Sequence, residues 1–313
     1  MANLSEVTYF YLSGYYDMDS MKPLYFLLFL IIYIIIIAES SLLIGVVYHE
    51  KSLHEPMYLL LCNLAVNGLF GGTALLPAVL SNVLSDSHEI SLSLCQIQIY
   101  AIHTYAITEF TILAVMSYDR YVAICYPLSY HVIMSQRLVK LIVCMWLYPM
   151  LAFLIVLCFT LQLKFCKKAI DKIYCLNYLL VQLSCTKSPI TNIIGLFSVA
   201  IYTLPQLFMV FYSYAHILKI CLLSFNNSKR KALQTCIPHL LSIINYSIGC
   251  FFEIAQGRFN ITYISYHTKL FLSLYFLICP PMFNPLIYGL SIQVIRVRLL
   301  KLFRRQSRQV QVM

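Results

Sequence analysis

The residues with the clearest chemical potential are a few charged and amide side chains inside long apolar segments. Asp119 and Arg120 adjoin at the end of one such segment, Glu109 lies inside the same segment, and Glu39 and Asn67 lie inside two others. A charge in a hydrocarbon environment is costly unless it meets water, a partner or another polar group. We therefore expect the Asp119–Arg120 pair to face water or a partner protein. Glu39 and Glu109 would share a proton, a cation or the Asn67 amide, or form a protonated structural pair.

The sequence contains no recognisable catalytic or metal-binding motif. Neither HExxH nor GxSxG occurs, so we predict no enzyme and no metal site. The chain carries 22 Lys and Arg against 12 Asp and Glu, a net charge of +10. These basic residues lie between apolar segments rather than in one patch, so the charge does not predict a nucleic-acid partner.

Seven apolar segments must position these residues. Of the 313 residues, 61% are hydrophobic and 11% charged, with a mean hydropathy of +0.79. A helix needs about 20 apolar residues to cross a bilayer, and seven segments approach or exceed this length. We predict an all-α membrane protein, a seven-transmembrane helix bundle that forms one domain over 1–313. The spans are 24–48, 57–84, 95–126, 138–161, 190–222, 232–256 and 268–290.

The distribution of basic residues predicts how the chain lies in the membrane. With residues 1–23 extracellular, fourteen of the 22 Lys and Arg fall on the cytoplasmic side, and the main exception is the long segment 162–189. We expect a multi-pass plasma-membrane protein with Asn3 as a glycosylation acceptor. The cytoplasmic tail, 291–313, begins with alternating apolar and basic residues typical of a short amphipathic helix on the lipid surface.

The twelve cysteines divide by depth. Eight lie within spans or at their inner ends and are interpreted as packing residues. Four fall on the extracellular side, where oxidising conditions allow disulfides, and four cysteines permit three pairings. These four are Cys95, Cys166, Cys175 and Cys185.

Five motifs occur in order, each at a span boundary. Met116–Leu128 reads MSYDRYVAICYPL, and the other four are 53–58, 213–214, 231–240 and 281–288. Together they resemble the odorant-receptor family of rhodopsin-like G-protein-coupled receptors. The CNLxxNG pattern at 62–68 is similar to fish-type and class I members. One departure is Gly68, which stands where the family has an acid. Family members use that acid, with the glutamate matched by Glu109, to hold sodium, so a sodium ion near Glu109 is doubtful here.

The resemblance implies a mechanism and its residues. A small extracellular odorant would shift the bundle to a conformation that activates a heterotrimeric G protein of the olfactory, cyclic-AMP-raising type. Because residues 226–240 contain no acid, Arg120 would rest on Asp119 or on polar groups such as His239. The disulfides implied are Cys95–Cys175 and Cys166–Cys185. The coupling and switch residues are Asp119, Arg120, Tyr121, Tyr214, Lys231, His239, Asn284, Pro285 and Tyr288.

The ligand contacts are expected in the outer half of the bundle. Residues at helical spacing give a mostly apolar lining with few polar groups, which suits small odorants. Arg258 resembles a position of class I members and could bind an acid or amino acid through paired hydrogen bonds. It could equally anchor the helix end at the lipid interface or pair with Glu253. The candidates are Ile102, His103, Ala106, Ile107, Ser198, Tyr202, Cys250, Phe251, Ile254 and Arg258.

Two other classes remain as alternatives. A non-olfactory rhodopsin-like receptor would share the fold, but amine and peptide receptors do not share the four-cysteine pattern or the YDRYVAIC string. A membrane transporter would show broken helices or internal half-repeats, and the sequence shows neither.

Overall fold

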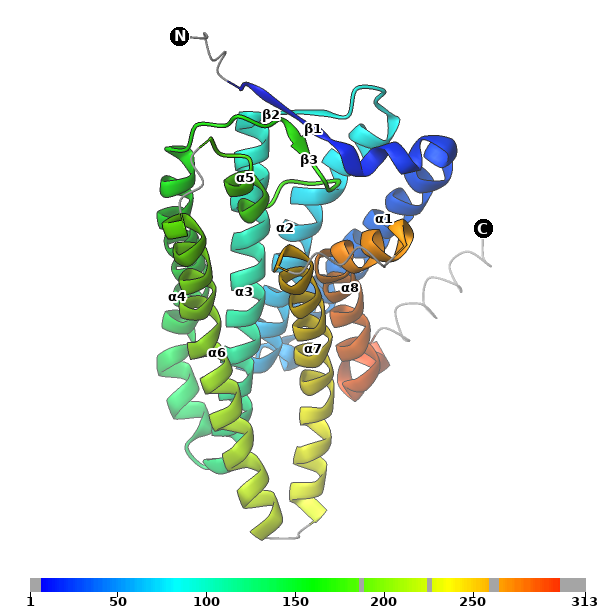
Figure 1. Cartoon of the computed structure of the whole chain (residues 1–313). Helices are drawn as coiled ribbons and strands as arrows, with labels where there is room; N and C mark the ends of the chain where they lie inside the picture. The colour runs from blue at the N-terminus through cyan, green and yellow to red at the C-terminus, as the bar shows by residue number, and fades with distance from the viewer. Residues whose placement is uncertain (1–6, 186–188, 224–226, 259–264, 299–313) are drawn as a thin grey trace, which may run out of the picture.

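The computed structural model describes residues 7–185, 189–223, 227–258 and 265–298, of which 189–192, 223, 227–234, 257 and 258 are described by their backbone only. Within these ranges seven helices are long and apolar enough to cross a membrane. This confirms the predicted seven-helix bundle (Figure 1). The seven are α1 (Lys22–His49), α2 (Pro56–Leu84), α3 (Leu92–Cys125), α4 (Tyr130–Leu161), α6 (Pro189–Leu223), α7 (Asn227–Arg258) and α8 (Tyr266–Ser291).

Helix α3 lies at the centre of the bundle. Among the described residues, α3 has more buried side chains than any other helix, and they include the polar residues Thr104, Thr108 and Glu109. Helix α2 approaches it closely at Gly71, where a Cβ atom would come within 2.4 Å of the Tyr105 ring. The Tyr105 hydroxyl in turn donates to the Phe276 carbonyl of α8 at 3.2 Å. Glycine at position 71 thus lets α2, α3 and α8 pack tightly together.

One end of the bundle carries a small sheet that the sequence did not predict (Figure 1). Strand β1 (Tyr9–Leu12) pairs antiparallel with β2 (Glu89–Ser91) and parallel with β3 (Ala169–Ile170), in the order β2-β1-β3. A 3-10 helix, η1 (Ser13–Met21), continues from β1 into α1, and a second, η2 (Lys51–Leu53), links α1 to α2. The long segment between α4 and α6 also contains the short helix α5 (Asn177–Gln182). The N-terminal segment is thereby tied to the loop between α2 and α3 and to the loop between α4 and α6.

The other end carries the start of the predicted amphipathic helix. Residues 293–298 are helical, Ile295 is fully buried in the bundle, and Arg298 pairs with Glu50 at 2.9 Å. The rest of the tail, from residue 299, lies outside the described residues. An apolar side chain facing the bundle and a basic one paired at its edge match the pattern expected of a surface helix.

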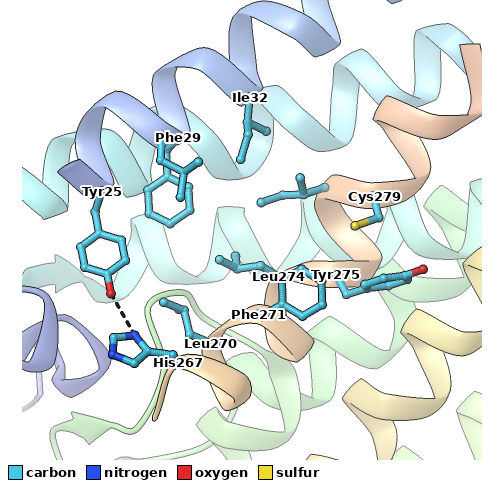
Figure 2. A pocket seen from close by; sticks show the side chains of 11 residues that line it. Tyr25, Phe29, Ile32, His267, Leu270, Phe271, Leu274, Tyr275 and Cys279 are labelled. Carbon is cyan, nitrogen blue, oxygen red and sulfur yellow. Dashed lines mark hydrogen bonds between the residues drawn. The ribbon is translucent and has the colours of Figure 1, made fainter. Parts of the chain in front are cut away.

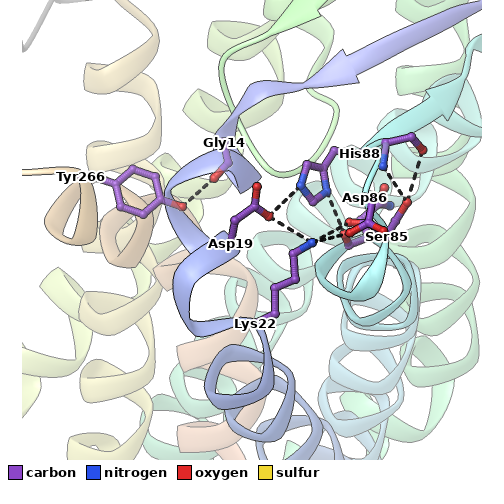
Figure 3. Close-up of polar contacts among 9 residues, drawn as sticks. Gly14, Asp19, Lys22, Ser85, Asp86, His88 and Tyr266 are labelled. Atoms are coloured by element: carbon purple, nitrogen blue, oxygen red, sulfur yellow. Dashed lines mark hydrogen bonds and ion pairs between the residues drawn. The ribbon is translucent and has the colours of Figure 1, made fainter.

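A polar cluster fastens η1 to the loop between α2 and β2 (Figure 3). The His88 side chain is buried, its Nε2 lies 3.1 Å from Asp19 Oδ1, and its Nδ1 lies 3.0 Å from the Asn82 carbonyl. Lys22 pairs with Asp86 at 2.8 Å, but the Asp86 side chain is 99% exposed. Because solvent screens exposed pairs, His88 should hold this junction far more strongly than Asp86 does.

We therefore expect His88→Asn to lower the free energy of unfolding by about 1–3 kcal/mol, because the shorter asparagine side chain at this buried position cannot reach both the Asp19 carboxylate and the Asn82 carbonyl. Asparagine suits the test because His88 has a positive φ of 47°, which asparagine tolerates. Asp86→Asn is the matched control and should change little. Thermal unfolding of the purified protein measures both effects, and equal effects of the two substitutions would contradict this ranking.

Candidate functional site

Two disulfides shape the sheet-bearing end of the bundle, which is called the outer end because the sequence predicts that it is extracellular; the opposite end is called the inner end. Cys95 at the start of α3 is bonded to Cys175, and Cys166 is bonded to Cys185. This is the pairing that the family resemblance implies. The backbone N–H of Cys175 also donates to the Gln98 side chain of α3 at 2.9 Å. The segment around residue 175 is therefore held directly over α3.

A buried ion pair lies beneath this loop. The Lys172 ammonium pairs with the Glu253 carboxylate of α7, and it donates to the Ser273 hydroxyl of α8 at 2.9 Å. The Tyr174 hydroxyl donates to the Ser273 carbonyl at 2.6 Å. The Lys172 and Glu253 side chains are only 11% and 10% exposed. Burial lowers the pKa of Lys172, and the charge of Glu253 acts in the opposite direction. The loop is thus joined to two spans by a desolvated charge pair.

Several predicted ligand residues do lie inside the bundle, where two of them contact α4. His103 stacks on Phe153 of α4 with ring centroids 4.3 Å apart, and its Nδ1 lies 2.8 Å from the Ile99 carbonyl. The Tyr202 hydroxyl donates to the Ala152 carbonyl of α4 at 2.9 Å. Ile102 is buried, whereas Ala106, Ile107, Ser198 and Cys250 are partly buried.

The predicted face of α7 needs a correction. Phe251 and Ile254 are 67% and 45% exposed on the outside of the bundle, so they are not pocket residues. The side chains that α7 turns inward are instead Tyr246, which donates to the Ala106 carbonyl at 2.6 Å, and Glu253. The error has a simple cause: aromatic and aliphatic residues suit the pocket and the lipid equally well, and the polar Glu253 was the better guide to the inner face.

The centre of the bundle is organised around Glu109. Its two carboxylate oxygens accept hydrogen bonds of 2.7 Å each from Asn67 of α2 and Asn284 of α8. Asn67 also donates to the Tyr105 carbonyl at 3.1 Å. Glu39 takes no part in this network among the described contacts, since its side chain is only partly buried on α1. Glu109 contacts the Asn67 amide and Glu39 does not, so the expected sharing between Glu39 and Glu109 is not observed among the described contacts.

The inner end of α3 holds Arg120 against its own neighbour. The Arg120 guanidinium lies 2.5 Å from Asp119 Oδ2, and Asp119 Oδ1 accepts from the Tyr130 hydroxyl of α4 at 2.8 Å. Asp119 is buried and Arg120 is 15% exposed. Of the two resting partners expected for Arg120, the structure shows Asp119. His239 is engaged elsewhere, with Tyr214 of α6 and with the Leu113 carbonyl.

The inner face is closed in this structure. Met57, Met116, Arg120, Thr235, His239 and Tyr288 line a cavity of only about 10 Å³, room for no more than one water molecule. Tyr121 is partly exposed beside Tyr212 and His216, and Pro285 and Tyr288 are buried in α8. Arg120 is therefore largely enclosed by its neighbours in this structure.

Some predicted residues lie beyond what the structure describes. Asn3 is outside the described residues, and Lys231 and Arg258 are described by their backbone alone. Arg258 is the last residue of α7, five positions after Glu253. Lys172 was not among the predicted site residues. The sequence signal that could have indicated it was Glu253, an acid inside the outer half of a span that needs a basic partner.

Comparison with known proteins identifies the family. A family model described as "Olfactory receptor" matches residues 29–306. The chain is 34% identical to Olfactory receptor 11A1 of Homo sapiens, over 90% of this chain and 89% of the relative. It is 34% identical to Olfactory receptor 5M5 of Mus musculus, over 97% and 95% of the two chains. The chain belongs to the olfactory receptor family. This olfactory receptor is therefore a G-protein-coupled receptor for odorants in the plasma membrane, and neither an enzyme nor a transporter.

Family membership raises the question of sodium. The network around Glu109 offers one carboxylate, and both of its oxygens already accept amide hydrogens from Asn67 and Asn284. Gly68 supplies no side chain, and a Cβ there would meet Pro281 of α8 at 3.3 Å. The residues present therefore do not fit the two-carboxylate sodium site, and we assign Glu109 a structural role in holding α2, α3 and α8 together.

Proposed function

We propose that the odorant of this receptor carries a negative group, as an acid or an amino acid does, and that it binds beneath the loop held by Cys175. The observation that supports this most is the cluster of lysines in the disulfide-bonded loop between α4 and α6. The loop between α4 and α6 includes Lys164, Lys167 and Lys168, of which the first two are exposed. Clustered positive charge raises the local concentration of anions and their rate of association. Arg258, at the end of α7, supplies a guanidinium suited to carboxylates.

This proposal includes the orientation of the chain. We place residues 7–21, the small sheet and both disulfides outside the cell, because disulfides form in oxidising compartments. Arg120 and the helix at 293–298 then face the cytoplasm. Signal transfer would run from the loop through α7, which carries both Glu253 near the ligand and His239 beside the inner cavity.

Arg258→Ala is expected to weaken the cyclic-AMP response to an acidic odorant by roughly ten- to hundredfold, as loss of about 1.5–3 kcal/mol from a charged hydrogen bond implies. Lys269→Ala is the matched control. It removes an exposed basic residue near the start of α8, at the same end of the bundle as Arg258. The measurement is a dose–response curve in cells that express an olfactory-type G protein, against panels of acids, amino acids, amines and neutral odorants. If the receptor instead responds selectively to neutral or cationic odorants, and Arg258→Ala leaves their potency unchanged, the proposed anion site is contradicted.

A further inference from the structure

An apolar groove separates α1 from α8 on the outer half of the bundle (Figure 2). It encloses about 230 Å³ and is lined by α1 residues between Tyr25 and Ile32 and by α8 residues between His267 and Cys279. Its floor consists of buried side chains such as Phe29 and Leu274, which belong to the bundle core. None of the predicted ligand residues lines it. The groove is therefore separate from the odorant site proposed above.

The groove opens toward the bilayer rather than toward water. Leu28 and Phe271, on either side of it, are 48% and 59% exposed, and both belong to transmembrane helices. Apolar side chains exposed on such helices face lipid hydrocarbon. Any occupant must therefore be dissolved in the membrane before it binds. The eleven described lining residues include no Asp, Glu, Lys or Arg, so the occupant should carry no net charge.

One end of the groove is polar. The Tyr25 hydroxyl lies 3.0 Å from His267 Nδ1, at the outer ends of α1 and α8 (Figure 2). From His267 to Cys279 the apolar wall then continues for twelve residues, about 18 Å at 1.5 Å per residue. The Tyr25 oxygen has a further lone pair beyond the bond to His267. A polar end joined to a long apolar wall fits an amphiphile with its head toward the outer surface.

The polar pair also selects the head group. A hydroxyl both donates and accepts, so it can join Tyr25 and His267 whichever of them donates to the other. A carbonyl can only accept, and an ammonium or carboxylate would bring a charge into an uncharged groove. The volume is below the roughly 300–1,000 Å³ of sites for drug-sized ligands, which excludes a two-chain phospholipid from full enclosure.

We propose that the groove between α1 and α8 is a second odorant site, which takes a small aliphatic alcohol from the outer leaflet. The proposal rests on the membrane orientation proposed above, and not on the anion site. It assigns Tyr25 and His267 to the alcohol hydroxyl, and Ile32, Leu274 and their neighbours to its hydrocarbon chain.

The test is photolabelling of the purified receptor in phosphatidylcholine nanodiscs with a diazirine-bearing octanol. Label should concentrate in peptides that contain residues 25–32 and 267–279, and excess octanol should compete with it. Ile32→Trp, which fills the groove, should reduce this labelling about tenfold or more. Ile34→Trp should not, because Ile34 lies on the lipid-facing side of α1 and is 55% exposed. Tyr25→Phe should weaken competition by octanol about three- to tenfold, as loss of one hydrogen bond implies.

The outcomes separate this site from its alternatives. If Ile32→Trp fails to fold, Leu28→Trp at the half-exposed rim provides the same block at a tolerant position. Labelling spread evenly over the lipid-facing helices, or competition by cholesterol but not by octanol, would overturn the proposal. Arg258→Ala should leave the labelling unchanged, so failure of the anion site and failure of this groove give different results.

Discussion

Replacing Arg120 with alanine is expected to abolish odorant-driven cyclic-AMP production, because Arg120 is the charged residue at the closed inner cavity. The structure adds a complication that the motif alone does not show. Asp119 is buried and relies on Arg120 and Tyr130 for its hydrogen bonds. Removing the guanidinium leaves that carboxylate with the Tyr130 hydroxyl alone, and breaking a buried pair costs about 3–5 kcal/mol. Arg120→Ala should therefore also lower surface expression.

A double variant separates the two effects. Asp119→Asn together with Arg120→Ala removes the unpaired charge, so surface expression should recover while signalling stays absent. Asp119→Asn alone releases Arg120 from its ion pair and is expected to raise basal cyclic-AMP without odorant. Cell-surface labelling and a cyclic-AMP reporter measure the two quantities in the same cells. Normal odorant signalling from a well-expressed double variant would refute the role of Arg120 in coupling.

The parts of this receptor that follow from local sequence were predictable. Each span is a run of apolar residues long enough to cross the bilayer, and that signal does not depend on any other part of the chain. Asp119 and Arg120 were identifiable because charges at the end of such a run need a partner. Their ion pair joins adjacent residues, so the sequence already brings the two charges together.

The parts that depend on distant contacts were not predictable. The parallel pairing of Tyr11 with Ala169 joins residues on either side of four spans. Lys172 and Glu253 lie 81 positions apart, so the sequence around Glu253 indicates the need for a basic partner but not which lysine supplies it. The faces of α7 were misassigned at Phe251 and Ile254 because hydrophobicity does not distinguish the interior of a membrane bundle from its lipid surface. The disulfide pairing came from family resemblance, since four cysteines alone allow three arrangements.

The largest stability effect is expected at the ion pair between the outer loop and α7. Glu253→Ala would leave the Lys172 ammonium buried beside Tyr174 and Ser273 without its paired carboxylate, and only the smaller effect of Asp171 would then oppose burial. Loss of Glu253 thus removes the charge that most strongly opposes the effect of burial, so the pKa of Lys172 should fall further and the lysine should tend to lose its proton. Breaking a buried pair on one side costs about 3–5 kcal/mol, and thermal unfolding of the purified receptor should reveal it.

The decisive comparison is between removing one partner and removing both. Lys172→Met combined with Glu253→Leu replaces the pair by apolar side chains, which in other buried pairs is neutral or stabilising. The double variant should therefore unfold near the wild-type temperature, whereas each single variant unfolds well below it. Lys164→Met, at an exposed position of the same loop, is the matched control and should change nothing. If the double variant is also as unstable as Glu253→Ala, the hydrogen bonds to Tyr174 and Ser273 rather than the charges hold the loop. If all variants match the wild type, the loop is not fastened here, and its position rests on other contacts, which include the Cys95–Cys175 bond, Gln98 and the pairing of β3 with β1.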